Sequence, residues 1–165
     1  MKFRNAIIYT THIDTTFGGL TLAATDKGLA GVWFDQQRHW PVMTGWVTRG
    51  DHPVLREAIA QLGDYFAGRR HVFDLPLDLS HGTAFQQSVW LALLAIPAGK
   101  TTSYGAISAG VGNPAAVRAV GAAVGRNPIS VIVPCHRVLG ANGSLTGYAG
   151  GLDRKTALLE LEGAM

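Results

Sequence analysis

Polar and hydrophobic residues alternate with a period of two along much of the first third of the chain, which is typical of β-strands that bury one face. Three segments are alternating or rich in β-branched residues, at 5–10, 19–25 and 29–34. Asp26-Lys27-Gly28 lies between the last two and supplies a glycine where a hairpin turn needs a positive φ. We therefore predict a small antiparallel sheet, followed by an irregular connection over residues 36–50, where polarity is mixed.

The period then changes to that of an amphipathic helix over residues 53–66, with Gly68 as a suitable stop. Apolar residues recur there at helical spacing, at Leu55, Ile59, Leu62 and Phe66. Residues 72–79 alternate like one more strand, and His81-Gly82 is the predicted domain boundary.

The second half is predicted to consist of short helices. Thr83-Ala84-Phe85-Gln86 has the form of a capping box and begins a helix that continues to about Ala95. Ser103 is placed to cap a helix over residues 104–109. Asp153 is placed to cap a last helix that ends near Glu162.

A further helix is predicted from Asn113 as N-cap, through Pro114 at the first helical position, to Gly125 at its exit. The short turn Gly110-Val111-Gly112 joins it to the helix before, which predicts a helix-turn-helix. The second helix of this pair carries small side chains and a single arginine, too little to read base edges in a major groove. It suits close approach to a narrow groove, although a tightly packed core helix has the same pattern.

These elements predict an α+β fold in two domains. Residues 1–81 form a small antiparallel-sheet domain with a structural role, and residues 82–165 form a mainly helical, winged-helix-like domain that contains the helix-turn-helix. The hydrophobic content of 47% and charged content of 15% are typical of a globular protein. There is no apolar run near the ~20 residues that span a membrane and no long apolar segment of a secretory signal. With one free cysteine, we expect a cytoplasmic protein.

Charge is unevenly distributed. Residues 1–81 carry eight basic and eight acidic side chains, which cancel, whereas no Asp or Glu occurs from Leu79 to Leu152. The net charge of +3 therefore belongs to the second half. This is expected of a face that binds a polyanion, and equally of a small Ala- and Gly-rich domain with few charges.

The only cysteine, Cys135, lies in Ile132-Val133-Pro134-Cys135-His136-Arg137-Val138. A lone cysteine forms no intramolecular disulfide, so it is either a buried apolar residue or a reactive thiol. β-Branched residues running into Pro134 predict a thiol at the exit of a strand. The neighbouring His136 and Arg137 favour the thiolate, so we interpret Cys135 as a nucleophile.

Pro134-Cys135-His136-Arg137 resembles the active-site signature of the O6-alkylguanine-DNA alkyltransferases, also called methylated-DNA–protein-cysteine methyltransferases. The resemblance is strongest from 82 to 163 and extends through Tyr104, Arg118-Ala119-Val120-Gly121, Asn127-Pro128, Gly147-Tyr148, Gly150-Gly151 and Glu162. It implies a single-turnover enzyme that repairs O6-alkylguanine, and O4-alkylthymine, in double-stranded DNA. It also assigns DNA binding and alkyl transfer to the domain of residues 82–165. The base is flipped out of the helix, and its alkyl group is transferred irreversibly to Cys135.

The resemblance also implies the catalytic residues. His136 acts on Cys135 through a bridging water, and Glu162 orients the histidine. Asn127 secures the active-site turn. Tyr104 crowds the phosphate on the 3′ side of the target and is a candidate proton donor to the purine; a helix-packing aromatic is the alternative for it.

For DNA, the resemblance implies a helix in the minor groove, with Arg118 filling the space that the flipped base leaves. The expected DNA contacts are Tyr104, Ala115, Ala116, Arg118, Ala119 and Gly121. A plain phosphate contact is the alternative for Arg118.

Residues 147–151 resemble the substrate loop, in which glycines let the backbone approach the flipped base. Tyr148 is expected to stack on that base, and a mobile surface loop is the alternative reading. The family often has Ser where this chain has Ala149, so the side-chain hydrogen bond to guanine O6 is in doubt here, although a backbone N–H could still serve. The expected substrate-binding residues are Val133, Pro134, Tyr148, Ala149 and Gly150.

The product of such a transfer is a thioether, which has no activated carbonyl for water to attack, so each molecule acts once. We expect no cofactor and no metal, because the single cysteine leaves none for a Cys-based zinc site. We expect a monomer in solution and leave open whether it assembles cooperatively on DNA. Two rivals remain: a thiol hydrolase, which would turn over repeatedly, and a non-catalytic lesion binder, against which Cys135 argues.

Overall fold

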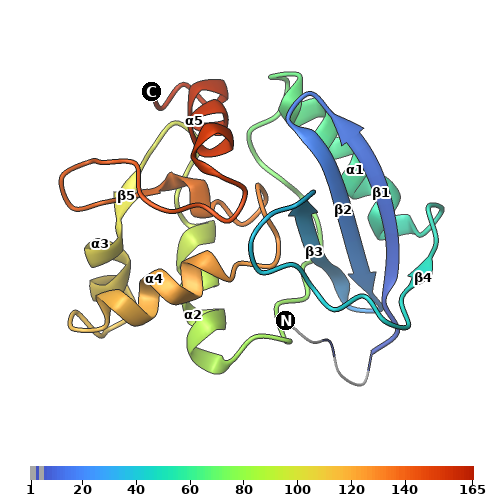
Figure 1. Cartoon of the computed structure of the whole chain (residues 1–165), viewed down its shortest axis with the longest axis horizontal. Coiled ribbons are helices and arrows are strands. Elements are labelled where there is room, and N and C mark those ends of the chain that lie inside the picture. Colours follow the sequence, from blue (N-terminus) through green and yellow to red (C-terminus); the bar gives the residue numbers. More distant parts are fainter. Residues whose placement is uncertain (1–2, 4–5) are drawn as a thin grey trace.

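The N-terminal part is a four-stranded sheet with one helix packed on it (Figure 1). The computed structural model describes residue 3 and residues 6–165. The strand order is β3-β2-β1-β4. The bounds are β1 Tyr9–Thr15, β2 Gly18–Thr25, β3 Gly28–Phe34 and β4 Val47–Thr48. β2 is antiparallel to both β1 and β3, whereas β4 pairs with β1 in parallel, so the sheet is mixed.

Three strand predictions need correction. The first strand lies at 9–15 rather than 5–10, because the pairing of Thr15 with Gly18 fixes the hairpin turn; Asn5 lies outside the described residues. β4 lies within the segment predicted to be irregular. Residues 72–79 form no strand and make only an isolated bridge, between Leu77 and Leu29. Pro76 lacks the N–H that a ladder would need.

Helix α1, Pro53–Phe66, has the predicted bounds. Gly68 has a φ of 77° just beyond its C-cap, as expected of a glycine that ends a helix. The helix buries its apolar stripe against the sheet, through Leu55, Ala58, Leu62 and Tyr65.

The C-terminal part is mainly helical (Figure 1). Its helices are α2 Ala84–Leu94, α3 Tyr104–Gly110, α4 Val117–Gly125, α5 Leu152–Leu161 and the 3₁₀ helix η1 Cys135–Arg137. A two-stranded parallel ladder joins β5 Thr102–Ser103 to β6 Val138–Leu139. The capping box of Thr83 and Gln86 is present, and the Ser103 hydroxyl accepts from the backbone N–H of Ala106, so both predicted caps are confirmed.

Two helix starts were predicted wrongly. α4 begins at Val117 rather than Pro114, because the carbonyl of Asn113 closes a turn with the Ala116 N–H and also accepts from the Ser108 hydroxyl. α5 begins at Leu152 after Gly151, whose φ is 95°, so Asp153 lies in the first turn and does not cap the helix.

One hydrophobic core runs through both parts, from Leu20 and Leu22 in the sheet to Val120 and Leu158 in the helices. A backbone bridge between Val32 of β3 and Ile129 ties the sheet directly to the loop before the active-site turn. The predicted α+β fold is confirmed, whereas the domain boundary at 81/82 stays a prediction. Among the described residues, none of the helices combines the length and apolar character needed to cross a membrane.

Candidate active site

Cys135 is the first residue of η1, and the chain before it folds back on itself instead of forming an extended strand. The Val133 N–H donates to the Ile129 carbonyl, and the Cys135 N–H donates to the Val133 carbonyl. Val131 has a φ of 73°, a left-handed conformation that is strained for a β-branched residue. The predicted strand exit is therefore wrong, and the thiol is presented by a tight turn.

Asn127 fastens this turn from inside. Its side-chain amide donates to the Val133 carbonyl at 2.7 Å, and its side-chain oxygen accepts from the Ile129 N–H at 2.9 Å. Both bonds are buried, so they hold the loop across the strained Val131. The placement agrees with the role expected for Asn127.

Cys135 is buried, with only 7% of the residue exposed. Burial raises the pKa of Cys135 to about 11, and the nearby Asn127 amide and Lys155 ammonium offset this only in part. The expectation that His136 and Arg137 would favour a resting thiolate is therefore wrong. Arg137 is paired with a carboxylate, and burial lowers the pKa of His136 and so favours its neutral form.

His136, Glu162 and Arg137 form a buried network. Nε2 of His136 lies 2.8 Å from Oε2 of Glu162. Arg137 donates to both carboxylate oxygens, each bond measuring 2.8 Å, and its third nitrogen donates to the Ile96 carbonyl. The hydroxyl of Tyr65 in α1 also donates to Oε2, at 2.5 Å. The sequence indicated no part for Tyr65, because nothing local links it to residue 162.

This network fixes the protonation of the imidazole. Burial alone would raise the pKa of Glu162, but hydrogen bonds from Arg137, His136 and Tyr65 hold it at about 2. Because the carboxylate carries no proton, Nε2 of His136 must donate, which leaves Nδ1 as an acceptor. Nδ1 is buried and has no hydrogen-bond partner among the residues that the structure describes.

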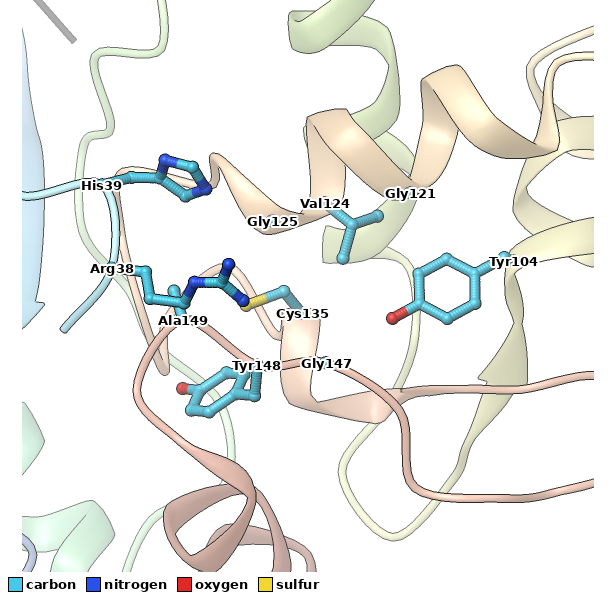
Figure 2. A pocket seen from close by; sticks show the side chains of 10 residues that line it. All are labelled: Arg38, His39, Tyr104, Gly121, Val124, Gly125, Cys135, Gly147, Tyr148 and Ala149. Carbon is cyan, nitrogen blue, oxygen red and sulfur yellow. The ribbon is translucent and has the colours of Figure 1, made fainter.

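Cys135 borders a pocket of about 190 Å³ (Figure 2). Tyr104 lies on one side of the thiol in this view, and Arg38 and His39 lie on the other. The remaining lining residues are Gly121, Val124, Gly125, Gly147, Tyr148 and Ala149. Arg38 and His39 were missed by sequence reasoning, because the segment that carries them was interpreted as an irregular connection. Their place in the pocket brings the N-terminal part to the thiol.

The predicted substrate loop borders this pocket and is held on two sides. The Ala149 carbonyl accepts from the backbone N–H of Arg38 at 3.0 Å. The buried ammonium of Lys155 donates to the carbonyls of Val138 and Thr146, at 2.6 and 2.7 Å. Such ties oppose the alternative of a freely mobile surface loop.

Gly150 shows why this loop needs a glycine. A Cβ atom there would lie 2.8 Å from the Tyr148 ring and 3.0 Å from Phe34. Tyr148 is itself buried, and its hydroxyl has no hydrogen-bond partner within the described part of the chain. Only Tyr148 and Ala149 of the five predicted substrate residues line the pocket. Val133 is wholly buried, and Pro134 borders a second cavity together with Arg137.

The helix-turn-helix consists of α3 and α4. Arg118 and Ala119 are exposed in the first turn of α4, whereas Ala115 and Ala116 precede the helix. Gly121, farther along, lines the pocket together with Tyr104. The structure thus arranges the predicted DNA contacts from an exposed surface toward the thiol. Among the described residues, no group of three or more His, Cys, Asp or Glu side chains is arranged to hold a metal ion.

Fold and site together define an α+β protein in which a helix-turn-helix borders a pocket with a single buried thiol. The family model described as "6-O-methylguanine DNA methyltransferase, ribonuclease-like domain" matches residues 8–79. The model described as "6-O-methylguanine DNA methyltransferase, DNA binding domain" matches residues 84–164. The chain therefore belongs to the 6-O-methylguanine DNA methyltransferase family.

Individual relatives support this assignment. A methylated-DNA–protein-cysteine methyltransferase of Mycobacterium bovis is 51% identical over 156 residues, which cover 94% of this chain and 93% of that protein. One from Methanosarcina acetivorans is 49% identical over 158 residues, with coverages of 95% and 99%. The crystal structure of Mycobacterium tuberculosis OGT in complex with DNA has a TM-score of 0.85 and 50% sequence identity. That match covers 95% of this chain and 92% of the other.

Proposed function

We propose that this chain repairs O6-alkylguanine, and O4-alkylthymine, in double-stranded DNA by moving the alkyl group to Sγ of Cys135. The observation that carries the proposal is the position of the single thiol. It lies in a pocket bordered by the second helix of a helix-turn-helix and by the substrate loop. A target base must leave the stack to enter such a pocket, which makes the reaction a base-flipping one.

In the transfer step, the sulfur–carbon bond forms as the bond between the alkyl carbon and O6 breaks. The thiol proton passes through a bridging water to Nδ1 of His136, the buried acceptor that lacks a partner among the described residues. The purine takes up a proton, for which the Tyr104 hydroxyl on the pocket wall is the candidate donor. Solvent then restores the proton of Tyr104 and accepts the one on His136.

The raised pKa of Cys135 gives this relay a clear task. At about 11, the thiol stays protonated at neutral pH, so the nucleophile must be generated when the substrate is bound. His136 suits this role because its lowered pKa keeps the imidazole neutral near pH 7. An unoccupied molecule therefore carries a protected thiol.

DNA would be held in its minor groove by α4. The exposed Arg118 would fill the space that the flipped base leaves, and the small residues around it allow close approach of the helix. The chain between 79 and 152 holds no acidic residue that would repel phosphates. We expect a monomer in solution, acting in the reducing cytoplasm, where a free thiol persists.

The product is a thioether on Cys135, which water does not cleave, so each molecule acts once. The alkyl group passes directly from O6 to the sulfur, and this step needs no cofactor. Incubation with an equimolar O6-methylguanine duplex should add one methyl group, mapped by peptide mass spectrometry to Cys135. Cys135→Ser should accept none while still binding the duplex. Methyl uptake by the serine variant, or on another residue, would overturn the proposal.

A further inference from the structure

Tyr65 reaches the site from helix α1, which packs on the N-terminal sheet. The residue is 1% exposed, and its hydroxyl donates to Oε2 of Glu162, 97 residues away in sequence, at 2.5 Å. Oε2 is the same oxygen to which Nε2 of His136 donates. One carboxylate oxygen is thus shared between the N-terminal part and the histidine of the relay.

This hydroxyl is not needed to orient the carboxylate. Arg137 already donates to both oxygens of Glu162 in a two-pronged pair, which fixes the plane of the carboxylate. Tyr65 adds a further hydrogen-bond donor to Oε2. This bond withdraws negative charge from the oxygen and so weakens its interaction with the imidazole N–H of His136. Its contribution is therefore electrostatic.

Several groups face this centre. Arg137 comes from η1, Lys155 from α5, and Cys135 precedes the histidine. Arg137 and Lys155 both disfavour a positive charge on His136, whereas Glu162 favours it. Among the described residues with side-chain hydrogen bonds to Glu162, Tyr65 is the one from the N-terminal part. It acts on the histidine by limiting the influence of Glu162.

We propose that Tyr65 is a positioning residue for alkyl transfer, whose hydroxyl bond to Glu162 keeps His136 neutral with Nδ1 ready to accept the thiol proton. This rests on the proposed function of His136 and Glu162. The N-terminal part is then a working component of the relay. Without the hydroxyl, Oε2 keeps more negative charge and stabilises the imidazolium, which blocks the acceptor as the pH falls.

Tyr65→Phe removes the hydroxyl and keeps the ring. We expect the acid limb of the single-turnover rate, measured on an O6-methylguanine duplex, to move to higher pH by roughly 0.5–1 unit. The rate on the alkaline side should change much less. A role confined to packing would lower the rate at every pH without moving the limb.

Thr25→Val is the matched control, because the buried Thr25 hydroxyl donates to a different carboxylate, Asp78, at 2.6 Å. It removes the same kind of bond and should leave the pH profile unmoved. The proposal would be overturned if folded Tyr65→Phe had the same pH–rate profile as wild type. It would also be overturned if Thr25→Val moved the acid limb as far as Tyr65→Phe does.

Titration of the His136 ring by NMR separates this proposal from the function on which it rests. Tyr65→Phe should raise the pKa of His136, and the same change in a Glu162→Gln background should leave it unmoved. If wild type transferred no methyl group, the proposed function would fail at that step. If transfer occurred but the pKa of His136 were the same in wild type and Tyr65→Phe, the positioning role alone would fail.

Discussion

The buried amide of Asn127 holds both sides of the loop that presents the thiol. Its two bonds join Ile129 and Val133 across the left-handed Val131. Loss of the amide would leave the Ile129 N–H buried without a partner, at a cost of about 1–3 kcal/mol. It would also remove one of the two donors to the Val133 carbonyl, which keeps the Cys135 N–H, at a cost of about 1 kcal/mol.

Asn127→Ala should therefore lower the free energy of unfolding by about 2–4 kcal/mol, as measured by denaturant titration. Asn142→Ala is a suitable control, because the Asn142 side chain accepts one exposed backbone bond, from Ser144. It should cost less than about 1 kcal/mol. Equal losses in the two variants would show that the Asn127 bonds do not hold the turn.

At the scale of single residues, local sequence pointed to Cys135 and His136, and the family resemblance added Glu162; the structure brings His136 and Glu162 into contact. It did not point to Tyr65 or Arg38, because their relation to the site arises from the packing of the N-terminal part on the helices. The protonation of Cys135 was predicted wrongly for the same reason. Neighbours in sequence favour the thiolate, but burial, a property of the whole fold, outweighs them.

At the scale of elements, α4 determines what the helix-turn-helix presents to DNA. Arg118 is exposed in its first turn, and its side chain makes no hydrogen bond or ion pair with other described residues. The next turn of the helix carries Gly121, which lines the pocket. A wedge at one end of the helix and the pocket wall beside it fit the extrusion of a base toward the thiol.

Arg118→Ala should slow repair of methylated duplex at least about tenfold more than reaction with free O6-benzylguanine, because a wedge matters only where a stack must be opened. Paired single-turnover assays on the two substrates measure this. Lys100→Ala removes an exposed cation from the same acid-free stretch and should slow neither reaction selectively. Equal losses on both substrates in Arg118→Ala would exclude the wedge.

The helices were more predictable than the strands. α1 and α2 carry their own signals, an apolar stripe in one and a capping box in the other, and both lie where they were predicted. Residues 72–79 and the run before Pro134 have strand-like sequences, yet a strand exists only where a partner pairs with it. Each segment makes one isolated bridge to β3, at Leu77 and at Ile129, and does not continue along the sheet.

For the molecule as a whole, buried carboxylates tie distant segments together. Glu162 joins α1 to the active-site turn, and Asp78 joins the β2–β3 hairpin at Thr25 to the linker at Ser80. Burial would raise the pKa of each carboxylate, but the hydrogen bonds prevail and hold both at about 2. A carboxylate whose pKa is lowered on folding stabilises the protein above its unfolded pKa, and this contribution disappears as the pH falls.

Glu162 should thus stabilise the fold fully above about pH 4.5 and lose that contribution as the pH falls toward 2. The difference in unfolding free energy between wild type and Glu162→Gln, about 3 kcal/mol near neutrality, should narrow through this window. Denaturant titrations at several pH values measure it. Glu160→Gln, at an exposed position of α5 two residues before Glu162, should differ little from wild type throughout. If the difference in unfolding free energy between wild type and Glu162→Gln stayed constant with pH, the predicted link between the Glu162 pKa and stability would be contradicted.

Single use of the thiol is the central claim, and counting methyl groups tests it most directly. The protein is incubated with a large molar excess of O6-methylguanine duplex, and both repaired guanine and methylated protein are quantified over time. Repair should stop at one guanine per protein molecule, with all of the label on Cys135. Repair that continues beyond one equivalent, with Cys135 returning to its free thiol, would contradict the account and indicate a hydrolase.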